Sequence, residues 1–290
     1  MANFGKSRDA KLKGLKKAAS CRKGLFSVKW NKIISLLVIC IILLSPITAE
    51  AASGITIDSN NSREGIVRVA HSGIDKKIKV MVEKGSTKYY YDLKKEEDFF
   101  PLQLGQGDYT VSVLENIAGI KYKVVAQKSF KAEITEMNSI YLQSTQPIVW
   151  NYDMESIILA NSLAQGEKDT LKVVQAIYDY IVNNIGYDYK KADKLSSDYI
   201  PEIDTILRDG KGICYDYSVL FAAMLRSRGI PAKMAKGYRD GIEKYHAWNE
   251  VYLDGRWKVI DATFGIVAIK AGTSCQMFQD EDKYRKLREY

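Results

Sequence analysis

The sequence has few residues that bind transition metals. Its 290 residues include only two histidines, His71 and His246, and four cysteines. Neither histidine lies near cysteines or paired acids at ligand spacing, so we expect no zinc site and no cofactor. Two of the cysteines fall within residues 1–51, which leaves Cys214 and Cys275 in the rest of the chain. In an oxidising compartment these two thiols would tend to pair, so a structural disulfide is the alternative to a chemical role.

Excess basic charge is confined to the first 32 residues. They hold ten Lys or Arg and one Asp, a net charge of +9, whereas the other 258 residues hold 33 basic and 34 acidic side chains. A nearly neutral body has no general electrostatic reason to bind a phosphate backbone. We therefore expect no nucleic-acid partner.

The apolar run near the N-terminus is short for a membrane-spanning helix. It covers the twelve residues 33–44, whereas a spanning helix needs roughly 17–25 residues. This length is typical of the core of a secretory signal, and Ala49-Glu50-Ala51 has the small-x-small pattern that a signal peptidase recognises. We predict a basic leader and signal peptide over residues 1–51 and a secreted or cell-surface protein. The long basic stretch leaves an uncleaved membrane anchor at residues 33–49 as the alternative, and we expect no other contact with a membrane.

The next region, residues 52–147, is predicted to be all-β. Its segments with alternating or continuous apolar residues are 65–70, 76–85, 87–93, 107–115 and 120–127. They recur about every ten residues, and Gly, Asp and Asn separate them, as in a small immunoglobulin-like β-sandwich. No residue set here indicates chemistry, so we interpret this domain as a spacer or a weak binding module.

The pattern changes to a helical period in residues 148–270. Apolar residues lie three and four apart in segments 154–164 and 170–185, a third helix begins near Cys214, and strands follow it. Helices followed by a β-hairpin predict an α+β domain with its helices packed on one side of an antiparallel sheet. The charged residues 271–290 are predicted to be a tail that ends in a solvated helix.

Cys214 lies at the predicted start of a buried helix. Gly210 and Gly212 precede it, and apolar residues recur at helical spacing from there to Gly229. Unpaired backbone amides and the helix dipole at such a position favour an anion, and hence the reactive thiolate form of a cysteine. A cysteine is also a common small core residue, so placement alone leaves both roles open.

Residues 245–264 are predicted to form a β-hairpin. Asp254-Gly255 is a strong signal for a two-residue turn. Such a loop pairs Leu253 with Arg256 and sets the register of the whole hairpin.

This register places four side chains on one face of the sheet. His246 is expected opposite Thr263, and Trp248 opposite Asp261. His246 and Asp261 then become diagonal neighbours, close enough for an imidazole to contact a carboxylate. Asn249 falls on the opposite face by the same register.

The combination of Cys214, His246 and Asp261 predicts a catalytic triad. An acid beside a histidine sets its tautomer and stabilises the imidazolium, while the other ring nitrogen takes the thiol proton. Nucleophilic acyl transfer needs this arrangement. The alternative for the pair is a structural hydrogen bond within an aromatic-rich sheet.

Three separate segments resemble the motifs of the transglutaminase-like superfamily. They are GKGICYDYSVLFAAMLRSRGIPA at 210–232, HAWNEVYL at 246–253 and DATF at 261–264. The resemblance covers roughly residues 165–265. It implies a papain-like fold in which a helix bears the cysteine and a sheet bears the histidine and the acid. It also implies that Cys214 is the nucleophile, His246 the base and Asp261 the orienting acid.

The sequence departs from animal transglutaminases in ways that leave the reaction open. Tyr215 follows the cysteine where those enzymes have Trp, and nothing resembles their calcium sites. The backbone amide of Cys214 is an expected oxyanion donor. Tyr187 or Tyr189 could support it with a hydroxyl, although packing against the core is the commoner role of a tyrosine.

We therefore expect an extracytoplasmic cysteine acyltransferase or amidohydrolase. Its substrate would be an amide of a protein or a cell-wall peptide, attacked to form a thioester at Cys214. The alternatives are a cysteine protease of the same fold, or a surface binding or scaffold module without catalysis.

Overall fold

The computed structural model describes residues 54–73 and 75–290. The predicted leader, its cleavage site and the alternative anchor lie outside the described residues. Within the described part of the chain, no helix is both long and apolar enough to cross a membrane.

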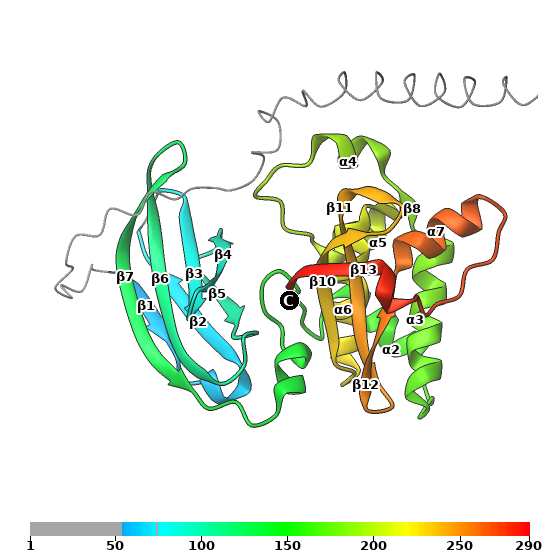
Figure 1. The fold of residues 1–290 in the computed structure, drawn as a ribbon, viewed down its shortest axis with the longest axis horizontal. Helices are drawn as coiled ribbons and strands as arrows, with labels where there is room; N and C mark the ends of the chain where they lie inside the picture. Colours follow the sequence, from blue (N-terminus) through cyan, green and yellow to red (C-terminus); the bar gives the residue numbers. More distant parts are fainter. Residues whose placement is uncertain (1–53, 74) are drawn as a thin grey trace, which may run out of the picture. The chain divides into compact units, whose positions relative to one another are not determined.

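Residues 55–132 form an all-β region, as the alternating segments predict (Figure 1). The strands described are β1 (Ile55–Asp58), β2 (Ile66–His71), β3 (Ile78–Lys84), β4 (Thr87–Leu93), β5 (Glu97–Pro101), β6 (Gly107–Ala118) and β7 (Lys121–Ala132). One sheet has the order β1-β2-β5 and the other β4-β3-β6-β7, with every pair antiparallel. Side chains from both sheets share one apolar core. This is an immunoglobulin-like sandwich, in which only the short strands β1 and β5 are absent from the sequence-based prediction.

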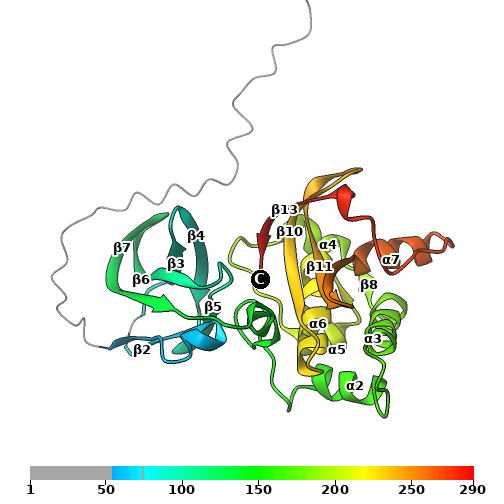
Figure 2. The same ribbon diagram turned by 60° about the horizontal axis from the view of Figure 1, so that its bottom comes forward.

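The following region is mixed. Its helices are α2 (Glu155–Leu163), α3 (Thr170–Asn184), α4 (Tyr189–Lys194), α5 (Ile203–Asp209), α6 (Cys214–Ser227) and α7 (Ala262–Lys270). Its strands are β8 (Gly186–Tyr187), β9 (Lys211–Gly212), β10 (Ala232–Arg239), β11 (Ile242–Leu253), β12 (Arg256–Ile260) and β13 (Tyr284–Glu289). Short 3₁₀ turns lie at Ser62–Glu64, Met137–Leu142 and Glu281–Lys283. An antiparallel sheet of order β12-β11-β10-β13 packs on α6, which confirms the α+β prediction (Figure 2).

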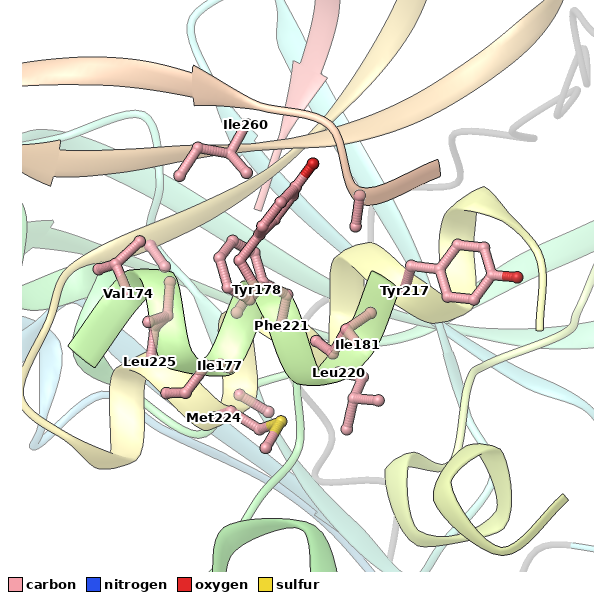
Figure 3. Close-up of a cluster of buried hydrophobic side chains, with 14 of the residues drawn as sticks. Val174, Ile177, Tyr178, Ile181, Tyr217, Leu220, Phe221, Met224, Leu225 and Ile260 are labelled. Atoms are coloured by element: carbon pink, nitrogen blue, oxygen red, sulfur yellow. The ribbon is translucent and has the colours of Figure 1, made fainter. Parts of the chain in front are cut away.

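Helix α6 is buried along almost its whole length, because apolar residues occupy nearly all of its faces. Figure 3 shows Ile177 and Ile181 of α3 beside Leu220 and Phe221 of α6, with Ile260 of β12 in the same cluster. Each fully buried side chain of this size contributes about 1.5–3 kcal/mol relative to an exposed one. This packing holds α6, and therefore the residue at its start, in one position.

The β11–β12 hairpin has the predicted turn and register. Asp254 and Gly255 have positive φ angles of 53° and 79°, as the two central residues of a type I′ turn require. The pairing runs from Leu253 with Arg256 to Asn249 with Ile260. The predicted parity of the hairpin is confirmed over this stretch.

The prediction of a solvated helix at the C-terminus is wrong. Residues 284–289 form β13, which pairs with β10 at the edge of the sheet. Its side chains are mostly exposed or half-buried, so backbone pairing rather than an apolar pattern holds the strand there. Gly237 permits this approach, because a Cβ atom at that position would lie 2.1 Å from the carbonyl oxygen of Arg285.

Candidate active site

The first turn of α6 places the thiol of Cys214. The preceding residue, Ile213, is extended with φ −118° and ψ 176°, so Cys214 is the first residue with helical conformation. Cys214 is partly exposed to solvent. The backbone amides of this turn have no partners within the helix, which makes the position favourable for an anion.

Asp216 anchors the start of this helix. Its carboxylate is fully buried, and its Oδ2 atom accepts a hydrogen bond from the amide of Ile213 at 2.9 Å. The same oxygen lies 2.6 Å from Nζ of Lys191, and Oδ1 accepts from the hydroxyl of Tyr199 at 2.6 Å. These contacts join the segment around α4 to the turn that bears Cys214. The sequence gives no sign of the link to α4, because Lys191 and Tyr199 are far from Asp216 along the chain.

His246 of β11 contacts Asp261, as the sequence predicts. Nε2 of His246 lies 2.8 Å from Oδ2 of Asp261, and both side chains are buried. This contact leaves Nδ1 as the ring nitrogen available to Cys214, whose side chain also interacts with the imidazole. The structure therefore brings the three predicted residues together.

The surroundings of His246 favour its charged form. Burial alone would lower the pKa of His246, but the hydrogen bonds to Asp261 and Cys214 and the negative charges of both groups raise it to about 10. An imidazole that readily holds a proton can accept one from a thiol and later deliver it to a leaving group.

The hairpin is only part of the reason for the His–Asp contact. Strand β12 ends at Ile260, and Asp261 is the N-cap of α7, where its Oδ1 accepts from the amide of Phe264 at 3.1 Å. The expected pairing of His246 with Thr263 is wrong, because Thr263 lies in α7 rather than in a strand. Because Asp261 caps the helix with its side chain, the strand ends before it, earlier than the predicted register implied.

Tyr284 of β13 is a further partner, which the sequence does not reveal. Its hydroxyl donates to Oδ2 of Asp261 at 3.0 Å and accepts from Nε of Arg239 at 2.9 Å. Its ring packs against Trp248, with centroids 5.0 Å apart. The charged C-terminal sequence does not predict this role, because Tyr284 reaches the site only through the pairing of β13 with β10.

A pocket of about 440 Å³ opens beside these groups. Cys214, His246, Tyr187 and Tyr189 all line it. Burial, and then the charge of Cys214, raise the pKa of Tyr187, so its hydroxyl remains a donor near the thiol. Tyr189 is 58 % exposed and stacks edge-on with Tyr187, with ring centroids 4.8 Å apart. Lys236 also lines the pocket, and no motif in the sequence singles it out.

Cys214 and Cys275 are both free thiols, which agrees with a chemical rather than a disulfide role for Cys214. Within residues 54–73 and 75–290, no group of three or more His, Cys, Asp or Glu side chains is arranged to hold a metal ion.

Comparison with known proteins gives one family match. Residues 158–262 match the model of the Transglutaminase-like superfamily, which confirms the resemblance stated from the three motifs. The chain is 34 % identical over 126 residues to kyphoscoliosis peptidase of Mus musculus, a match that covers 40 % of this chain and 19 % of that protein. It is 28 % identical over 192 residues to UPF0252 protein MJ1282 of Methanocaldococcus jannaschii, covering 60 % of this chain and 54 % of the relative. The chain thus covers about a fifth of the length of the first relative and about half of the length of the second.

Among solved structures, the periplasmic domain of TgpA from Pseudomonas aeruginosa is similar with a TM-score of 0.39 and 14 % identity, over 77 % of this chain and 96 % of that one. Red sea bream transglutaminase is similar with a TM-score of 0.32 and 12 % identity, over 72 % of this chain and 53 % of that one. Scores this low assign no activity.

Proposed function

We propose that this chain, whose residues 158–262 match the Transglutaminase-like superfamily, is a cysteine enzyme that transfers or hydrolyses the acyl group of an amide. The observation that carries the proposal is the contact of His246 with both Cys214 and Asp261 at the edge of an open pocket. If His246 had only a structural role in the sheet, it would not need the thiol of Cys214 beside it at the start of a helix.

The reaction follows from the roles that these positions allow. His246 takes the proton of the Cys214 thiol, and the thiolate attacks the amide carbonyl carbon. The backbone amide of Cys214 and the hydroxyl of Tyr187 are the proposed donors to the oxyanion. The C–N bond then breaks as the imidazolium of His246 gives its proton to the leaving amine, and a thioester remains on Cys214.

The second half returns the enzyme to its starting state. His246 removes a proton from water or from an incoming amine, which attacks the thioester and releases the thiol. Water completes hydrolysis, and an amine completes transfer or crosslinking. Asp261 stabilises the imidazolium in both halves through the contact at 2.8 Å.

The experiment compares the wild type with Cys214→Ala on candidate protein and cell-wall peptide substrates, followed by mass spectrometry. Hydrolysis adds one water to a cleaved amide, and transfer joins two peptides with loss of the amine. The proposal fails if both proteins give the same products. A wild type that binds such polymers but never forms a thioester would support a scaffold module.

We propose that the chain acts outside the cytoplasm, on protein or cell-wall peptide. The support is the sequence of residues 1–51, with its basic start, its apolar run at 33–44 and Ala49-Glu50-Ala51. N-terminal sequencing of exported protein should begin at Ala52. Material that keeps residues 1–51 in the membrane fraction would instead establish an anchor. The nearly neutral body gives no reason to propose a nucleic-acid partner.

A further inference from the structure

The charged residues of the pocket are not all paired. Lys244 and Asp193 line it together, with Nζ and Oδ1 4.0 Å apart, and both are highly exposed. Lys236 lines it beside Cys214. Among the described residues, no carboxylate forms an ion pair with Lys236 and no acceptor forms a hydrogen bond with its ammonium group.

The ammonium group of Lys236 lies against aromatic rings instead. Its Nζ atom is 3.3 Å from the ring centroid of Tyr215 and 5.6 Å from that of Tyr290. Ring contacts of this kind hold a cation in place but neutralise no charge. Burial lowers the pKa of Lys236 to about 8, although the charge of Cys214 acts in the opposite direction. The residue therefore remains largely cationic at neutral pH, in a place where a cation without a counter-ion is unfavourable.

The backbone fixes where this cation points. Lys236 of β10 pairs with Ala247 of β11, and Ala247 packs in the apolar core that includes α6. Lys236 thus lies on the sheet face that packs on α6, at the level of Tyr215 and of the first helical turn. An anion bound to Lys236 would lie next to the carbonyl that Cys214 attacks.

We propose that Lys236 is a specificity residue that binds a free carboxylate of the amide substrate, close to the reacting carbonyl. This rests on the proposed function, because it assumes that the amide carbonyl is placed at Cys214. The substrate class is an amide of a γ-glutamyl, β-aspartyl or similar unit that keeps its own α-carboxylate. A carboxylate there supplies the missing counter-ion, and a neutral amide does not.

Two small donors test this inference. N-Acetylglutamine and its α-N-methylamide share the side-chain amide and differ at the α-carboxyl group, which is a carboxylate in the first and a neutral N-methylcarboxamide in the second. Both can therefore release ammonia only from the side chain. Their dissociation constants are measured by calorimetry with the Cys214→Ala protein, and their turnover by ammonia release with the intact nucleophile. We expect the carboxylate donor to bind about ten- to a hundredfold more tightly, since a charge-assisted hydrogen bond contributes that much.

Three variants distinguish an effect of the Lys236 charge on donor preference from an effect on the structure of the pocket. Lys236→Met should remove the preference for the carboxylate donor and leave binding of the carboxamide donor unchanged. Lys236→Arg should restore most of the preference, because it restores the charge. Lys244→Met is the matched control, since it removes a pocket lysine that already has Asp193 as a partner, and it should keep the preference.

The outcomes distinguish this inference from the proposed function. Equal binding of the two donors by Cys214→Ala, or an equal loss for both in Lys236→Met, overturns the carboxylate subsite. Ammonia release that persists in Cys214→Ala refutes the proposed function instead. A carboxylate preference that depends on Lys236 supports the subsite whether or not the thioester forms.

Discussion

Replacement of Asp261 by Asn tests the electrostatic basis of the candidate triad. The carboxylate accepts three hydrogen bonds, with Oδ2 bound by His246 and Tyr284 and Oδ1 by the amide of Phe264. An asparagine has only one acceptor oxygen. If that oxygen faces His246, the amide of Phe264 meets an NH₂ group, and in the other orientation His246 loses its acceptor. Either orientation removes the negative charge that holds the imidazolium.

The expected result is a fall in the pKa of His246. The pKa is raised to about 10, and after the burial that opposes this rise, the hydrogen bond to Asp261 is the first cause. Removal of an opposite charge at this distance changes a pKa by about one to three units. Turnover should fall as well, by less than the roughly 10⁴-fold known for the equivalent change in a serine protease triad, because a thiol ionises more readily than a hydroxyl.

The pH dependence of stability has a definite sign. The folded-state pKa of His246 lies above the ordinary value of 6.5, so the imidazolium stabilises the fold fully below about pH 6.5. This stabilisation is lost as the pH rises through the folded pKa. In Asp261→Asn the loss should occur at lower pH and be smaller in size.

The pKa of His246 can be followed by NMR because the chain has few histidines. Selective ¹⁵N labelling gives signals from only two histidines, His246 and His71. The titration is best done in the Cys214→Ala protein, because an interacting thiol and imidazole titrate as a pair. The reasoning is refuted if the pKa of His246 is the same in folded protein with and without the Asp261→Asn substitution.

Asn249→Ala is the control. Nδ2 of Asn249 donates to the carbonyl oxygens of Ser218 and Lys233 at 2.8 and 3.0 Å, on the sheet face that packs on α6. Its loss should cost about 1–3 kcal/mol of unfolding free energy and leave the His246 titration unchanged. If this variant abolishes turnover in a folded protein while Asp261→Asn does not, the triad has a different third member.

Three further changes should separate the remaining roles. Tyr284→Phe removes the hydroxyl that donates to Asp261, and kcat should fall by about tenfold, less than for Asp261→Asn; an unchanged kcat would show that this hydroxyl is dispensable. Cys275→Ser should retain activity within about twofold, and mass mapping of active protein should find both thiols free, so a Cys214–Cys275 disulfide there would contradict the mechanism. Asp216→Asn removes the charge of a buried carboxylate whose partner Lys191 is half-buried, and it should lower the unfolding free energy by about 1–3 kcal/mol in urea titrations, an effect that an unchanged midpoint would disprove.

Local chemistry in the sequence was sufficient for much of this protein. Apolar period alone predicts the β-sandwich strands other than β1 and β5, and the helices α2, α3 and α6, because their apolar residues recur at the spacing of the buried positions. The turn at Asp254-Gly255 predicts the hairpin register, since positive φ at two successive residues leaves few alternatives. The three candidate triad positions follow from these two signals and from the family motifs.

The tertiary structure decided the groups that complete the site. Tyr284 reaches Asp261 only because an edge strand from the C-terminus pairs with β10, and backbone pairing of an exposed strand leaves little pattern in the side chains. Lys236 and Asp216 are single charged residues in ordinary elements, and only packing shows that Lys236 has no counter-ion and that Asp216 is buried with Lys191 as its partner. Burial and charge pairing are properties of contacts between distant segments, so no local pattern in the chain could reveal them.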